Sequence, residues 1–92
     1  MVKISAVIIA YNEEDFIERC LESLDGVADE IIVVDSLSTD STPERCKKYN
    51  VRFIQHEFEG YAEQKNYATS LAIYPYILSL DADEALSEEL KK

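Results

Sequence analysis

Residues 76–84 read Tyr76-Ile77-Leu78-Ser79-Leu80-Asp81-Ala82-Asp83-Glu84, an apolar run of strand length that stops at two aspartates. The run predicts a buried strand, and its acidic end would lie at the carboxyl end of that strand, where open α/β sheets bind ligands. Residues i and i+2 of a strand point to the same side, so Asp81 and Asp83 could direct both carboxylates into one small volume. Close carboxylates repel unless a cation lies between them, and their oxygens suit Mg²⁺ or Mn²⁺. Taken alone, an acidic loop that runs into a helix is the commoner explanation.

Three further apolar runs precede this stretch and alternate with helical patterns. The runs predict strands at residues 4–10, 30–35 and 51–56, with the third nearer an edge of the sheet because Arg52 and Gln55 interrupt it. The order β-α-β-α-β-α-β with short links predicts an α/β fold: a mostly parallel sheet with helices on both faces. Residues 1–92 then form one small domain, the first part of a longer α/β unit.

The intervening helices are predicted from apolar residues at helical spacing. The first stripe consists of Phe16, Ile17, Cys20, Leu21 and Leu24, and the third of Tyr61, Gln64, Ala68, Leu71 and Ala72. Asn12 is expected to cap the first helix, and Thr42-Pro43 to start a short second helix through Tyr49. Residues 87–92 resemble the first turn of another helix with Ser87 as its cap.

The charge and composition exclude several classes of protein. The formal net charge is −10, from 19 acidic and 9 basic residues, which argues against nucleic-acid binding and against docking on anionic lipid. No run approaches the ~20 apolar residues of a membrane-spanning helix. The two cysteines, Cys20 and Cys46, are expected to be reduced core thiols. We expect a cytoplasmic chain, with the full-length protein at most peripheral to the inner face of a membrane.

Polar residues follow three of the predicted strands and would meet at one edge of the sheet. Tyr11 could stack on a flat base, Asp35 could accept from a base N–H or a ribose hydroxyl, and Asp83 could hold a metal on a diphosphate. The plainer alternatives are a partly buried aromatic for Tyr11 and an acid that caps the 36–39 loop for Asp35. The joint placement of these residues at strand ends favours the ligand site.

The glycine and histidine content narrows the possible chemistry. With Gly26 and Gly60 as the two glycines, the chain has no glycine-rich phosphate-binding loop, so a phosphorylated ligand would need a cation. Lys65 is the best basic candidate, although helical spacing alone favours a solvated lysine there. His56 is the single histidine, which makes a zinc site or a catalytic triad improbable.

Four stretches in this order and spacing resemble family 2 glycosyltransferases. They read VIIAYNEE at 7–14, EIIVVDSLSTD at 30–40, QKNYA at 64–68 and ILSLDADE at 77–84. Within that family, HEFEGY at 56–61 followed by QKN makes the chain most similar to the lipopolysaccharide-core β-1,4-glucosyltransferase branch.

The resemblance implies a GT-A, Rossmann-like fold, inverting transfer from a nucleotide-diphosphate sugar such as UDP-glucose, and Mn²⁺ or Mg²⁺ as cofactor. The site residues it implies are Ala10, Tyr11 and Glu13 around base and ribose, Asp35 on the base, Lys65 near the phosphates, and Asp81, Ala82 and Asp83 as the D-x-D element. Asp83 would be the likelier direct metal ligand and Asp81 would lie nearer the ribose. The acceptor would be a saccharide or a lipid-linked saccharide.

The chain departs from the family pattern in two ways. Leu37 and Ser41 stand where the family usually has glycine, and a leucine forced to φ > 0 costs on the order of 1 kcal/mol. Family members also continue into an acceptor-binding half that carries the general base, which is therefore expected beyond residue 92. The chain alone is then expected to be inactive, and the apolar surface left by the missing half would favour self-association.

Two other classes of function remain open at this point. In an acidic-pocket, Mg²⁺-dependent signalling domain, Asp35 would be the phosphoacceptor, although such domains have their acidic pair after the first strand. A non-catalytic α/β interaction module would have acidic strand ends by chance.

Overall fold

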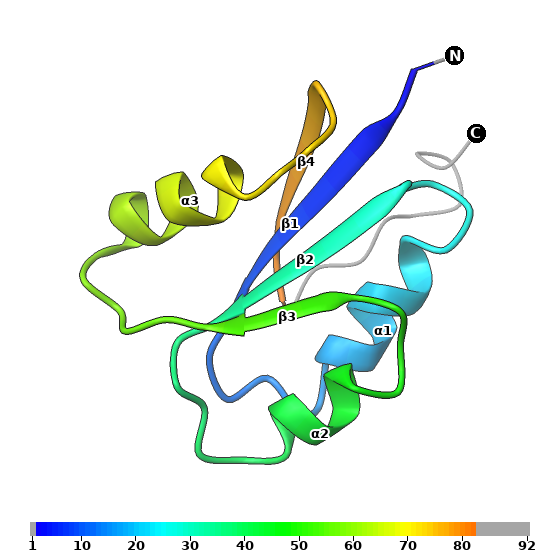
Figure 1. The fold of residues 1–92 in the computed structure, drawn as a ribbon. Coiled ribbons are helices and arrows are strands. Elements are labelled where there is room, and N and C mark those ends of the chain that lie inside the picture. The colour runs from blue at the N-terminus through cyan, green and yellow to red at the C-terminus, as the bar shows by residue number, and fades with distance from the viewer. Residues whose placement is uncertain (1, 83–92) are drawn as a thin grey trace.

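A computed structural model of the chain describes residues 2–82 as a four-stranded parallel sheet with helices on both faces, as predicted (Figure 1). The strands are β1 (Ile4–Ala10), β2 (Glu30–Asp35), β3 (Arg52–Gln55) and β4 (Tyr76–Asp81). The helices are α1 (Ile17–Ser23), α2 (Thr42–Cys46) and α3 (Tyr61–Ser70). Asp83 and the helical turn expected at 87–92 lie outside the described residues.

The strand order β3-β2-β1-β4 places a switch of direction beside the central strand β1. The chain moves outward from β1 through β2 to β3, and then returns to lay β4 on the other side of β1. In register, Ala10 pairs with Asp35 and Ile9 pairs with Asp81, so these strands end at the same level. Such a switch point is where open α/β sheets form a ligand crevice at the carboxyl ends of the strands.

Successive residues of the central strands pack against opposite layers of helices. Ala6, Ile8 and Ala10 of β1 lie in a core cluster with α1 and α2, whereas Val7 lies in a second cluster with Ala68 of α3. Figure 1 shows this division, with α1 and α2 on one side of the sheet and α3 on the other. The continuous apolar runs are explained by this two-sided burial.

Both cysteines are buried in the α1–α2 core cluster, as expected. Burial raises the pKa of the Cys46 thiol to about 12, with a smaller contribution from the negative charge of Asp35. Cys46 is therefore a protonated core side chain at neutral pH.

Several predicted boundaries are wrong. Asn12 does not cap α1, because Phe16 precedes the first helical residue; Phe16 is 46% exposed and so leaves the predicted apolar stripe. Helix α2 ends at Cys46 instead of Tyr49. Strand β4 is not a buried strand: within residues 2–82 it pairs with β1 alone, and Tyr76 and Ile77 are exposed. The position of β3 at an edge is confirmed.

A polar cluster at the amino ends of the strands closes the sheet opposite the crevice. The Glu30 carboxylate accepts hydrogen bonds from Ser5 Oγ at 2.6 Å, from the Ile73 backbone N–H at 3.1 Å and from Arg52 Nη1 at 3.2 Å. Burial raises the pKa of Glu30, but these hydrogen bonds outweigh it and leave the pKa lowered. Glu30 therefore joins β1, β2, β3 and the α3–β4 connection through one ionised side chain.

Candidate functional site

A cavity of about 430 Å³ opens at the carboxyl ends of the strands, where β1 and β4 lie side by side. Its lining comprises Ile9, Tyr11, Glu13, Ser36, Phe58, Tyr61, Asp81 and Ala82. Tyr11, Glu13, Asp81 and Ala82 were all predicted as site residues from the sequence. The crevice expected at the switch point therefore exists, and four of the eight predicted site residues line it.

Three half-exposed aromatic side chains border this cavity. Tyr11 is 55% exposed, Phe58 is 52% exposed and Tyr61 is 50% exposed. The sequence pattern placed Tyr61 on the packed face of α3, which is wrong, and gave Phe58 no role. Rings that keep one face open to a cavity can stack on a planar ligand.

Asp81 and Lys65 each contact the side chain of Tyr61. The Tyr61 hydroxyl donates a short hydrogen bond to Asp81 Oδ1, and Lys65 Nζ lies 5.0 Å from the centroid of the Tyr61 ring. Lys65 is not among the lining residues, but this cation–π contact holds its charge one side chain away from the cavity. Tyr61 of α3 thus contacts the acidic end of β4 through its hydroxyl group and Lys65 through its ring.

Ala10 and Asp35 lie behind the lining. Ala10 is buried, and the fully buried Asp35 carboxylate accepts from Ser38 N at 2.8 Å, Ser38 Oγ at 2.5 Å and Gln55 Nε2 at 3.2 Å. These are the loop-capping contacts of the plainer alternative for Asp35. A carboxylate offers about four acceptor directions, so these three contacts leave one direction unused among the described residues. Complete burial argues against Asp35 as a phosphoacceptor.

The described side chains fit a shared metal site better than a self-contained one. Within residues 2–82, no group of three histidine, cysteine, aspartate or glutamate side chains is arranged to hold a metal ion. Asp81 still supplies a carboxylate at the cavity wall, and Asp83 lies outside the described residues. Mg²⁺ and Mn²⁺ are commonly held by one or two carboxylates together with substrate phosphates, and Asp81 fits that arrangement.

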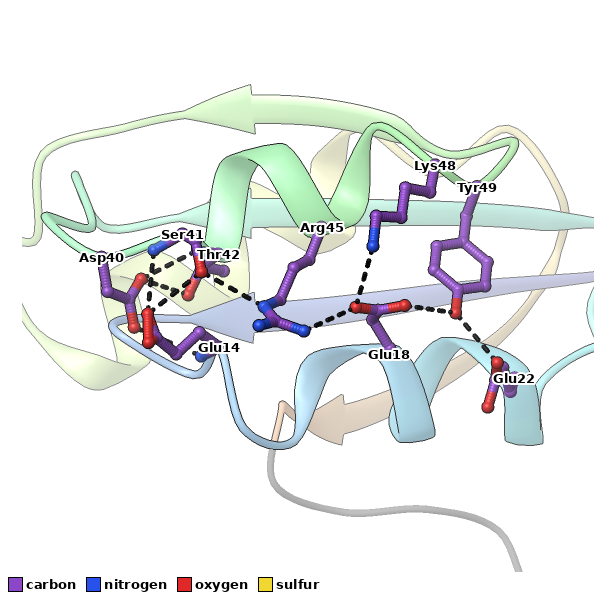
Figure 2. Close-up of polar contacts among 9 residues, drawn as sticks. All are labelled: Glu14, Glu18, Glu22, Asp40, Ser41, Thr42, Arg45, Lys48 and Tyr49. Atoms are coloured by element: carbon purple, nitrogen blue, oxygen red, sulfur yellow. Dashed lines mark hydrogen bonds and ion pairs between the residues drawn. The ribbon is translucent and has the colours of Figure 1, made fainter.

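Two loops next to the cavity are tied together by side chains that satisfy backbone N–H groups. Ser41 N and Oγ both donate to Glu14 Oε1 at 3.1 Å, and Glu14 N donates to Asp40 Oδ2 at 3.2 Å (Figure 2). Glu13 N donates to Thr42 Oγ1 at 2.8 Å. Asn12, at φ 51°, accepts from the Thr39 N–H at 2.8 Å. We call residues 12–14 and 38–42 the paired loops, and their contacts fix the backbone that carries Tyr11 and Glu13.

Helices α1 and α2 are joined behind the paired loops through Glu18. Its carboxylate accepts from Arg45 Nη1 at 2.8 Å and from the Tyr49 hydroxyl at 3.0 Å, and it lies 3.5 Å from Lys48 Nζ (Figure 2). These hydrogen bonds, with Arg45 the strongest, lower the pKa of Glu18. Tyr49 also donates to Glu22, and burial together with both bonds raises the pKa of its hydroxyl group.

Three lowered carboxyl pKa values predict a loss of stability in mild acid. For Asp40, burial raises the pKa but hydrogen bonds from Thr42 and from the Glu14 N–H outweigh it, as for Glu30. Groups whose folded pKa lies below the ordinary value of 4.5 (Glu) or 3.8 (Asp) stabilise the fold above that value. The stabilisation is lost as the pH falls through the folded pKa values. We expect the urea midpoint to be level from pH 7 to 6 and to fall steadily below about pH 4.5. A midpoint that holds constant down to pH 3 would contradict this.

Leu37 occupies a conformation that favours glycine. Its φ is 60° and its side chain is 50% exposed, so the backbone carries strain while the side chain contributes little burial. We expect Leu37→Gly to raise the free energy of unfolding by up to about 1 kcal/mol, measured by urea denaturation. Ser41, at φ −88°, needs no glycine, so Ser41→Gly should destabilise and serves as the control. A Leu37→Gly variant less stable than the parent would show that leucine packing outweighs the strain.

The sequence that forms this site matches a known protein family. The family model described as Glycosyl transferase family 2 matches residues 5–92. The chain belongs to glycosyltransferase family 2. The family resemblance of the sequence motifs is thereby confirmed.

Curated relatives extend well beyond the length of this chain. A protein of Rickettsia felis named as an uncharacterized glycosyltransferase is 45% identical over 91 residues, which cover 99% of this chain and 32% of the relative. The lipopolysaccharide core biosynthesis glycosyltransferase LpsC of Rhizobium meliloti is 39% identical over 94 residues, covering 97% of this chain and 34% of LpsC. The chain therefore spans about a third of the length of these family members.

Solved structures of family 2 type share the fold. S. aureus TarS (residues 1–349) superposes with a TM-score of 0.83 at 31% identity, covering 97% of this chain and 30% of TarS. Glucosyl-3-phosphoglycerate synthase from Mycobacterium tuberculosis, solved with Mn²⁺, UDP and glucosyl-3-phosphoglycerate, gives a TM-score of 0.79 at 25% identity, covering 91% and 36% of the two chains. The GT-A, Rossmann-like architecture is therefore established for this chain. None of the described helices is long and apolar enough to cross a membrane.

Proposed function

We propose that this chain forms the donor-binding part of a glycosyltransferase that takes a UDP-sugar, with UDP-glucose the leading candidate, together with Mn²⁺ or Mg²⁺. The observation that carries the proposal is the cavity at the ends of β1 and β4, because it joins exposed aromatic rings to an acidic strand end. The aromatic rings can stack on a flat base, and the acidic strand end suits a cation-bound diphosphate. The likeness to a synthase solved with Mn²⁺ and UDP supports the same assignment.

In this proposal each site residue has the role that the family resemblance implies. Tyr11 stacks on the base, while Asp35 supports the 36–39 loop and offers its remaining acceptor direction to the base. Glu13 accepts from the ribose. Asp81 and Asp83 contribute carboxylates to the cation, and when bound the cation stabilises the negative charge of the leaving diphosphate. Lys65, held over Tyr61, adds positive charge on the phosphate side.

The chemistry proposed for the full-length protein is inverting transfer to a saccharide or lipid-linked saccharide acceptor. The general base that takes the acceptor proton lies beyond residue 92 in this proposal, as the resemblance to family 2 glycosyltransferases implies. Similarity to LpsC supports a role in lipopolysaccharide or other cell-surface polysaccharide synthesis.

Calorimetric titration of the chain with UDP and with UDP-glucose tests the donor site. We expect binding with Mn²⁺ present, much weaker binding with EDTA, and loss of the Mn²⁺-dependent part in Asp83→Asn and Asp81→Asn. Asp25→Asn, an exposed acid at the far end of α1, is the matched control and should bind as the parent does. Absence of binding under every cation condition would leave the interaction module as the better description.

A further inference from the structure

Gln64 is a fully buried polar side chain that connects three elements. It lies on α3 with 1% exposure. Its Nε2 lies 3.0 Å from Ser36 Oγ and 3.2 Å from the backbone oxygen of His56, and its Oε1 lies 3.0 Å from His56 Nδ1. A buried amide is stable only when its donors and acceptor are satisfied, and these three contacts satisfy them.

The backbone carbonyl of His56 determines which way the Gln64 amide points. A carbonyl oxygen can only accept, so the amino group of Gln64 must face it, and Oε1 must then face His56 Nδ1. His56 Nδ1 therefore carries a proton and donates it. The imidazole ring is held for this bond by stacking on Tyr67, with ring centroids 3.9 Å apart and an interplanar angle of 20°.

The orientation of Gln64 in turn determines the direction of the Ser36 hydroxyl proton. Ser36 Oγ accepts the second amino proton of Gln64, so its own proton points away from α3. Among the described residues, no acceptor atom takes that proton. Ser36 is 8% exposed and lines the cavity, so its hydroxyl group is set to donate into the cavity.

We propose that Ser36 is a ligand-binding residue that donates a hydrogen bond to an acceptor oxygen of the bound nucleotide, and that Gln64 and His56 are its positioning residues. This inference rests on the proposed donor-binding function. Glu13 and Asp81, the carboxylates of the lining, can only accept when ionised, so Ser36 supplies the complementary polarity. A base carbonyl, a ribose oxygen and a phosphate oxygen share this acceptor chemistry.

The binding test compares Ser36→Ala with Ser70→Ala in titrations of UDP with Mn²⁺. Ser36→Ala should weaken UDP about fivefold to tenfold, the effect of one lost hydrogen bond. Ser70, an exposed serine of α3, should tolerate alanine without change. Titration with uridine separates the sources: a loss seen with both ligands assigns the bond to the nucleoside, and a loss with UDP alone assigns it to the phosphates. Unchanged UDP affinity in Ser36→Ala overturns the proposal.

The positioning role has its own test in Gln64→Glu. An ionised carboxylate cannot donate to Ser36, so it would accept the serine proton and turn it away from the cavity. Binding should then weaken as much as in Ser36→Ala, and the double variant should lose no more than Ser36→Ala alone. Additive losses in the double variant contradict the coupling of Gln64 to Ser36.

Nitrogen NMR of the free chain tests the orientation without any ligand. We expect a proton on His56 Nδ1, and slowly exchanging side-chain amino protons of Gln64. A proton on Nε2 alone overturns the assigned orientation even where UDP binds. The expected Nδ1 proton in a chain that fails to bind UDP would instead overturn the proposed function and, with it, the role of Ser36 in binding.

Discussion

Asp35→Ala is expected to lower UDP affinity at least tenfold and to destabilise the chain by about 3 kcal/mol. The carboxylate is fully buried and accepts three hydrogen bonds, two from Ser38 and one from Gln55. Its removal leaves those donors without their acceptor and opens a small void behind the cavity. Urea denaturation measures the loss of stability, and calorimetric titration with UDP and Mn²⁺, below the unfolding transition, measures the loss of affinity.

Ser38→Ala separates the two roles of Asp35. It removes the serine hydroxyl, which bonds to Asp35 and to the Asn12 N–H, but it leaves the carboxylate in place. If Asp35 also contacts the base, Ser38→Ala should keep most of the UDP affinity. Equal loss of affinity in both variants would mean that Asp35 acts through the loop alone.

Glu30→Ala is expected to lower the free energy of unfolding by about 3 kcal/mol without changing the cavity. One side chain, 9% exposed, accepts from Ser5, Arg52 and the Ile73 N–H, and these partners come from elements far apart in the sequence. Its loss also leaves the Arg52 charge without its partner. Chemical denaturation at pH 7 gives the value directly.

Two glutamate variants make the Glu30 measurement specific. Glu30→Gln keeps an acceptor oxygen but loses the charge, so it should cost about 1 kcal/mol. Glu57→Ala removes the same chemical group from an exposed position and should change stability by less than about 0.5 kcal/mol. A Glu30→Ala variant that behaves like Glu57→Ala would show that the polar cluster contributes nothing to stability.

The sheet could be predicted from the sequence because its central strands are buried on both faces. Residues 4–10 and 30–35 are mostly apolar, and the strands predicted there match β1 and β2 in full. The start of α3 at Tyr61 also matches. The end of α2 could not be predicted, because Tyr49 has the apolar spacing of a helix but turns its hydroxyl to Glu18 and Glu22. The exposure of β4 could not be predicted either, because it depends on which strands lie beside β4 in the sheet, and the sequence of β4 itself does not reveal this.

Part of the candidate site could also be predicted from the sequence. Residues at strand ends, such as Tyr11 and Asp81, follow from topology, and they line the cavity. Ser36 and Phe58 were not predicted, because a serine in a polar loop and an aromatic in a connection have no periodic signal. The role of Asn12 was also misread: a left-handed backbone turned its side chain across to the neighbouring loop instead of onto a helix end.

The pairing of β1 with β4 affects the order in which the strands assemble as the protein folds. Strands β1, β2 and β3 are neighbours along the chain as well as in the sheet, whereas β4 must return past all of them to reach β1. Contacts between residues distant in sequence form late, because closing a long loop costs entropy before the contact repays it. During synthesis on the ribosome, the wall that holds Tyr11 can therefore assemble first. Among the described strands β4 closes last, and until it does the nascent chain lacks the Asp81 wall of the cavity.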